Sequence, residues 1–288
     1  MRTTASPRRL SRYLGLVPFL TFTVLFLGLP VVFLVVGSLL DGEGNPTLAN
    51  YGELTRSIVA NAYITSIEVS AVTAIAGGIF GFLLAAAVIL GGLPRFLRTA
   101  LMTFSGVASN FAGVPLALAF IFTLGQLGLV TQLLDDVFGI SLRRSGFSLY
   151  TKLGLELTYM YFQFPLMVLI IAPAIDGLKK EWREAAENMG ASSFQYWRHV
   201  AFPVLLPSLL GTVILLFGNA FGAQATAFQL TGGTINLVPI LIGAQMSGDV
   251  LHNPNLGYAL AMGMVAIMAV SIGVYSVLQR RSERWLRS

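Results

Sequence analysis

The sequence predicts an all-α integral membrane protein with six transmembrane helices. Hydrophobic residues make up 55% of the 288 residues, while only 11% are charged. Soluble domains contain about 25% charged residues, so lipid is the expected surroundings of most of this chain. The apolar residues are also gathered in six stretches, each long enough for the roughly 20 residues that a helix needs to cross the bilayer.

The six predicted spans are separated by polar or charged segments. The first follows several arginines, as in a signal peptide, but signal peptides have apolar regions of only about 7–15 residues. We therefore interpret it as an uncleaved membrane helix. Prolines within the spans are compatible with helices whose neighbours satisfy the freed carbonyl groups. The spans are expected near residues 13–40, 58–90, 98–124, 150–173, 204–230 and 256–278.

Lysine and arginine are distributed unevenly around these spans. An even number of spans places both termini on one side, and 14 of the 18 basic residues fall on that side. Because cytoplasmic loops carry the excess of Lys and Arg, both termini are expected to be cytoplasmic. The expected organisation is a first part, 1–57, with a tail, one helix and an external loop. A core with five spans, 58–278, and a cytoplasmic tail, 279–288, would follow. Apolar residues at helical spacing from Leu129 to Val137 predict a short surface helix.

A charged segment, GLKKEWREAAENMGASSFQYWRHVAFP, lies between the fourth and fifth spans. Its pattern predicts a helix over about 178–189, capped by Asp176 and ended by a left-handed Gly190. Ser192 or Ser193 can cap a second helix that leads into the fifth span. The apolar face of the first helix contains Leu178, Trp182, Ala185, Ala186 and Met189, which follow helical spacing.

The opposite face of this helix carries charges of both signs. Lys180 with Glu184 and Arg183 with Glu187 are i,i+4 pairs, each contributing about 0.2–0.5 kcal/mol. A helix lying on lipid would have large apolar residues on one face and many Lys and Arg residues on the other. The mixed charges and the two central alanines favour docking into a groove of another protein, and both readings stay open at this point.

The same segment resembles the EAA signature of binding-protein-dependent ABC importer permeases. That signature is EAA, three residues, Gly, nine residues, then Ile-x-Leu-Pro, and here Val200 and Phe202 stand for the Ile and the Leu. Asn188 is more polar than the usual residue at its position. The resemblance extends over about 58–278 and implies the type I importer permease fold. The matching residues are Glu184, Ala185, Ala186, Gly190 and Pro203.

The resemblance implies that residues 178–189 form a coupling helix that docks on a separate ABC ATPase. It implies two such ATPases, which bind ATP and Mg, together with a second permease, identical or paralogous, and an external substrate-binding protein. The location would be the inner membrane of a bacterial cell. This chain has no phosphate-binding Gly-x-x-x-x-Gly-Lys-Ser/Thr loop. The residues implied in coupling are Glu184, Ala185, Ala186, Gly190, Val200, Pro203, Trp182 and Met189.

Several polar residues within the spans are candidates for the transport path. Carboxylates inside a membrane are costly and usually face the bundle interior. Glu68, expected near mid-bilayer, therefore attracts a cationic cargo, is protonated, or pairs with a polar group on a neighbouring helix. Glu156 either lines the path or pairs with Lys152 at i,i+4. Small-xxx-small spacing predicts close helix packing at Gly77 with Gly81 and at Gly218 with Gly222. The other path candidates, which can equally be packing residues, are Asn219, Gln224 and Thr226.

Other functions find less support in the sequence. His199 and His252 are the only histidines and are far apart, so we expect no metal site, and no nucleic-acid-reading motif is present. A membrane enzyme using Glu68 and Glu156, or a secondary carrier, would be the alternatives to an importer subunit. For cargo, the resemblance to the spermidine/putrescine-type branch and the two acidic residues favour a polyamine or another organic cation. Phosphonate, sulfate, iron and thiamine are the alternative cargoes.

Overall fold

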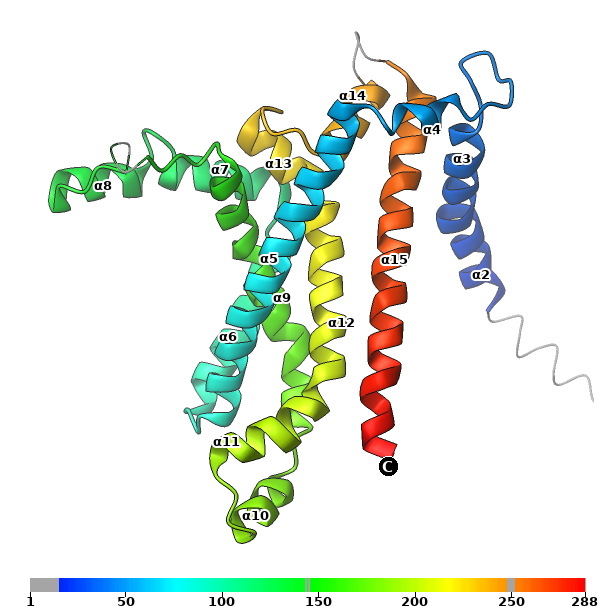
Figure 1. Cartoon of the computed structure of the whole chain (residues 1–288). Coiled ribbons are helices and arrows are strands. Elements are labelled where there is room, and N and C mark those ends of the chain that lie inside the picture. Colours follow the sequence, from blue (N-terminus) through cyan, green and yellow to red (C-terminus); the bar gives the residue numbers. More distant parts are fainter. Residues whose placement is uncertain (1–15, 143, 145, 248–251, 288) are drawn as a thin grey trace, which may run out of the picture. The chain divides into compact units, whose positions relative to one another are not determined.

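The computed structural model describes residues 16–142, 144, 146–247 and 252–287, and its named elements are all helices (Figure 1). Six helical stretches are long and apolar enough to cross a membrane, which confirms the predicted fold class. The basic residues of the N-terminal tail and Arg143 lie outside the described residues. The six stretches are Val17–Ser38, Ser57–Leu90, Gly113–Phe138, Lys152–Asp176, Ser193–Phe221 and Pro254–Arg280.

The chain divides into two compact units, the first of which comprises residues 1–59 and 242–265. Its N-terminal span is built from α2 (Val17–Thr23), the π-helical turn η1 (Val24–Gly28) and α3 (Leu29–Ser38). Pro30 follows the π turn, which is consistent with its missing N–H disturbing the regular hydrogen-bond ladder. The next loop, with the short helix α4 (Ala49–Glu53), folds back onto α3. There the Asn50 amide donates to the carbonyl oxygens of Ser38, at 3.1 Å, and Leu40, at 2.8 Å.

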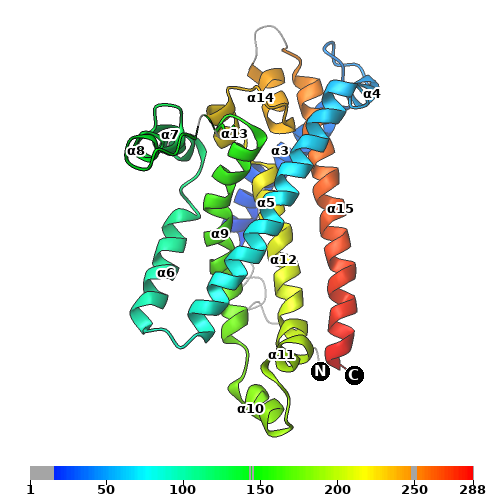
Figure 2. The same cartoon turned by 60° about the vertical axis from the view of Figure 1, so that its left-hand side comes forward.

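The second unit comprises residues 60–241 and 266–288. Its central helix is α9 (Lys152–Asp176), which packs against α5 (Ser57–Leu90), α6 (Arg95–Ala108) and α12 (Phe202–Phe221) (Figures 1 and 2). More than half of the apolar window of α9 is buried, the largest share of any span. The remaining helices are α7 (Gly113–Leu124), α8 (Leu129–Phe138), α10 (Lys180–Asn188), α11 (Ser193–Tyr196), η2 (Trp197–Ala201), α13 (Gln224–Thr231), α14 (Val238–Ser247) and α15 (Pro254–Arg287), of which α14 and α15 belong partly to the first unit.

Close contact between α5 and α9 follows from two glycines. A Cβ atom on Gly77 would lie 2.7 Å from Cβ of Gln163, and one on Gly81 would lie 2.6 Å from Cβ of Met167. Any larger residue would force the two helices apart. The predicted small-xxx-small packing face of the second span is thereby confirmed. Gly218 makes a similar approach to Met268 of α15, whereas Gly222 faces only its own helix.

Two predicted spans are not continuous helices. The expected span 98–124 breaks into α6 and α7, and the expected span 204–230 breaks into α12 and α13. The first break is turned by Gly113, whose φ of +73° favours a glycine, and the second falls after Gly222. Hydropathy alone missed both breaks because apolar residues continue on either side. The helix α14 was also not expected, whereas the helix predicted around Leu129–Val137 is present as α8.

Candidate functional site

The EAA segment forms a helical hairpin beyond the ends of α9 and α12 (Figure 1). Its first arm, α10, ends in a complete Schellman motif. Gly190, at φ +76°, donates its N–H to Glu187 O at 2.9 Å, and the Ala191 N–H returns to Ala186 O at 3.0 Å. The predicted left-handed role of Gly190 is therefore confirmed. This cap ends α10 sharply and turns the chain back toward the membrane helices.

The second arm begins with a reciprocal cap. The Ser192 hydroxyl accepts from the Gln195 N–H at 3.3 Å, and the Gln195 side chain accepts from the Ser192 N–H at 2.7 Å. Of the two predicted caps, Ser192 is therefore the one used. The helix continues through the π turn η2 into α12, with Pro203 in the first turn of α12. Pro203 has no N–H to donate to the carbonyl of His199, which lies in this π turn.

The predicted N-cap of α10 is wrong. Asp176 is the last residue of α9, and Lys179 occupies the cap position without a side-chain cap hydrogen bond. The Asp176 carboxylate instead pairs with Arg98 of α6, with 2.5 Å between Oδ2 and Nη2. The physical reason is that the end of α9 packs beside α6, where an arginine supplies a stronger partner than a backbone N–H.

The apolar face of α10 is only partly covered by the hairpin itself. Ala186 is buried, in a cluster with Tyr196 and Ala201. Met189 is 81% exposed and Trp182 36% exposed, and Glu184 and Ala185 are also exposed. Of the predicted charge pairs, Arg183–Glu187 forms at 2.9 Å, and no ion pair joins Lys180 to Glu184 in this described segment. Glu184 therefore stands unpaired on an exposed surface beside apolar side chains.

Three of the predicted path residues gather around one cavity of about 410 Å³. Asn219 and Gln224 are exposed on the chain by itself, and neither carries a charge. Thr226 is buried and committed to structure, because its hydroxyl accepts from the Gly113 N–H at 2.8 Å. The cavity lies where the two helix breaks meet, and Ser109 from the first break also lines it. Sequence reasoning missed Ser109; the turn-forming run SNFAG within an apolar stretch was the available signal.

The structure separates the two acidic candidates from this cavity. Glu68 of α5 pairs with Lys152, the first residue of α9, and Glu156 lies within electrostatic range of both. The expected i,i+4 pair of Lys152 with Glu156 is therefore replaced by a pair between helices. This order, Lys before Glu, is the weaker one on a helix, and α5 passes near enough to offer a better partner. This ion pair is the pairing with a neighbouring helix that was one of the alternatives for Glu68. A role of Glu68 in the transport path stays a prediction.

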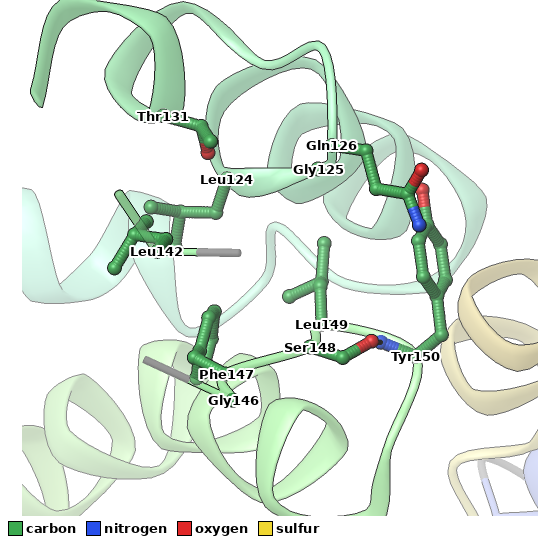
Figure 3. Close-up of a pocket in the computed structure, with 10 residues that line it drawn as sticks. All are labelled: Leu124, Gly125, Gln126, Thr131, Leu142, Gly146, Phe147, Ser148, Leu149 and Tyr150. Carbon is green, nitrogen blue, oxygen red and sulfur yellow. Dashed lines mark hydrogen bonds between the residues drawn. The ribbon is translucent and has the colours of Figure 1, made fainter. Parts of the chain in front are cut away.

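A second cavity, of about 280 Å³, contains none of the predicted site residues (Figure 3). It lies between the end of α7, the start of α8 and the segment before α9. Its walls carry Leu124, Phe147 and Leu149 beside the polar Gln126 and Tyr150. The hydroxyl of Thr131 is buried at its edge without a hydrogen-bond partner within the described structure. Among the residues that the structure describes, no charged side chain lines this cavity, so the described lining does not distinguish one ligand class.

Known proteins with a similar sequence or fold agree with this arrangement. The sulfate transport system permease protein CysT of Salmonella typhimurium is 30% identical over 215 residues, which cover 74% of this chain and 72% of that protein. The spermidine/putrescine permease PotB of Haemophilus influenzae is 29% identical over 129 residues, covering 44% of each. A bacterial ABC transporter that imports alginate shares the fold, with a TM-score of 0.77 at 16% identity over 95% of this chain and 96% of that chain.

These findings first define a class: a multi-pass membrane protein with the fold of an ABC importer permease. The family of binding-protein-dependent transport system inner membrane components matches residues 77–288, and the chain belongs to it. Its members are transport subunits, and in ABC importers ATP is hydrolysed on a separate subunit. Family membership therefore decides against the membrane enzyme and the secondary carrier considered above.

Proposed function

We propose that the chain is the membrane subunit of an ATP-driven importer and that α10 is its coupling helix. The observation that carries this proposal is the exposed surface of Glu184, Met189 and Trp182 on a rigidly capped helix outside the membrane bundle. An apolar surface that carries an unpaired carboxylate suits a groove that contains a basic residue. We propose that such grooves belong to two ABC ATPase subunits, which bind ATP and Mg.

The same proposal includes the other partners and the orientation. A second permease, identical or paralogous, would complete the path, and an external binding protein would deliver cargo. The positive-inside distribution supports a bacterial inner-membrane location with α10 and both termini in the cytoplasm. The alginate importer is described together with a periplasmic protein that binds its cargo, which supports this kind of partner.

For cargo, we propose an oxyanion of the sulfate type in place of the polyamine favoured by the sequence. Relatives named as sulfate permeases match over up to 76% of this chain, against 44% for the polyamine relative. The cavity at Asn219 and Gln224 offers neutral amide donors, and oxyanions accept hydrogen bonds. Uncharged donors bind an anion weakly enough to release it, as a transport path requires.

The test is uptake of labelled sulfate by the complex with its ATPases and binding protein in liposomes. Glu184→Ala and Gly190→Pro should each lower uptake about tenfold or more while the chain still inserts, because the docking charge or the helix end is lost. Glu181→Ala, on the same helix, is the matched control and should transport normally. Normal uptake by both test variants would overturn the coupling role, and uptake of spermidine but not sulfate would overturn the cargo.

A further inference from the structure

Two apolar clusters meet at the base of the α10 hairpin. The hairpin cluster consists of buried Ala186, Tyr196 and Ala201 with the residues packed on them. The bundle cluster lies among α5, α6, α9 and α12 and includes Ile175 and Leu205. Within the described structure, the two clusters share two residues, Leu178 and Trp197, both partly buried.

These shared residues stand at the two stems of the hairpin. Leu178 lies between the end of α9 and the start of α10, and Trp197 begins the π turn that leads into α12. The Trp197 ring meets Phe82 of α5 edge-on, with 6.4 Å between ring centroids and an interplanar angle of 81°. Because interiors are close-packed, these two side chains connect the hairpin cluster to the bundle cluster, and Trp197 does so by direct contact with α5.

An ion pair holds the first stem to another helix. Arg98 of α6 pairs with Asp176, two residues before Leu178, and Leu101 and Met102 of α6 belong to the bundle cluster. The pair is partly exposed, with 44% and 41% of the two side chains accessible. Such pairs contribute little stability by themselves. Its position at the stem, rather than its strength, connects α6 to the hairpin.

We propose that Leu178 and Trp197, with the Arg98–Asp176 pair beside Leu178, form a joint that transmits movement of α10 to α5 and α6. The inference rests on the proposed coupling role of α10. The joint residues are positioning residues: Leu178 and Trp197 are not among the residues that line the cavity at Asn219 and Gln224, and they convert a movement of the exposed hairpin into a movement of the membrane helices. Ordinary packing residues would affect only stability when they are substituted. The proposed joint residues should also affect the coupling of ATP hydrolysis to transport.

The experiment measures ATP hydrolysis and sulfate uptake by the reconstituted complex, and reports sulfate transported per ATP. Leu178→Ala and Trp197→Ala should bind the ATPases normally but lower this ratio about fivefold or more, which is the lower range of typical coupling between sites. Trp197→Phe keeps a ring on Phe82 and should retain most of the ratio. Leu153→Ala, at an exposed site outside both clusters, is the matched control.

The ion pair supplies a second test on variants that remain folded, because both side chains are partly exposed. Arg98→Asp and Asp176→Arg should each lower the ratio, and the double exchange should restore it. Arg95→Asp, on the same helix, should leave it unchanged. Wild-type ratios in all joint variants, with only the amount of folded complex reduced, would overturn the joint. If Glu184→Ala also transports normally, the proposed function itself fails; if Glu184→Ala is inactive, only the joint is refuted.

Discussion

Glu68 and Lys152 show how a charge is accommodated on membrane helices. Each would be costly alone in an apolar environment, and the structure pairs them across α5 and α9. The pair is partly exposed in the isolated chain, where 56% of the Glu68 side chain is accessible. A face with exposed charges is poorly suited to lipid, so we expect this part of α5 to face protein or water in the assembled importer.

A substitution tests the importance of this pair. Glu68→Gln leaves the Lys152 ammonium without its partner and should lower the free energy of unfolding by about 1 kcal/mol, the upper range for an exposed pair. The measurement is thermal unfolding of the detergent-solubilised chain. Glu156→Gln should have the smaller effect, and adding Lys152→Gln to Glu68→Gln should recover part of the loss. A larger effect at Glu156 than at Glu68 would contradict the pairing.

At the scale of elements, the contact of α5 with α9 depends on residues without side chains. Gly81→Ala would place a Cβ atom 2.6 Å from Cβ of Met167 and 2.9 Å from the Phe164 carbonyl oxygen. Backbone cannot move aside cheaply, so the substitution should cost about 1–3 kcal/mol by overpacking. Gly273→Ala on α15 meets no atom within 4 Å and should be neutral or slightly stabilising. Equal unfolding temperatures of the two variants would rule out the tight contact.

The helix breaks belong to the same scale. The Thr226 hydroxyl of α13 bonds the N–H of Gly113 at the start of α7, so the two breaks hold each other in place. The N–H of Gly113 in the first break thus finds its acceptor in the second. Irregular backbone at membrane depth occurs where protein buries it or where it lines a water-filled cavity, and here it borders the cavity at Asn219 and Gln224. This connects the interrupted spans to the proposed path.

At the scale of the whole molecule, the orientation in the membrane can be tested directly. The chain has no cysteine, so a single introduced thiol can be labelled without background. Leu127→Cys and Met189→Cys introduce thiols at sites that are 83% and 81% exposed. A membrane-impermeant maleimide should label Leu127→Cys in intact cells and Met189→Cys only after permeabilisation. The reverse pattern would place α10 outside the cell and contradict the proposed coupling.

The sequence by itself determined where the apolar stretches lie and how the α10 hairpin turns at Gly190 and Ser192, because hydropathy and these two caps are local properties. The length of an apolar run, the glycine at Gly190 and the serine at Ser192 each act within a few residues of the chain. The EAA spacing is likewise contained in one segment, and it pointed to the family before any tertiary contact was known.

Only the tertiary structure decided which helix each polar residue meets. In the sequence, Asp176 was a plausible helix cap, but in the structure its carboxylate pairs with Arg98, 78 residues away. Lys152 could have paired along its own helix, but it pairs with Glu68 of another helix. Nothing in the sequence distinguishes Leu178 and Trp197 from other apolar residues, and only the structure shows that both pack against both clusters. Such contacts depend on how distant segments pack, and packing is a property of the whole fold rather than of any local window of sequence.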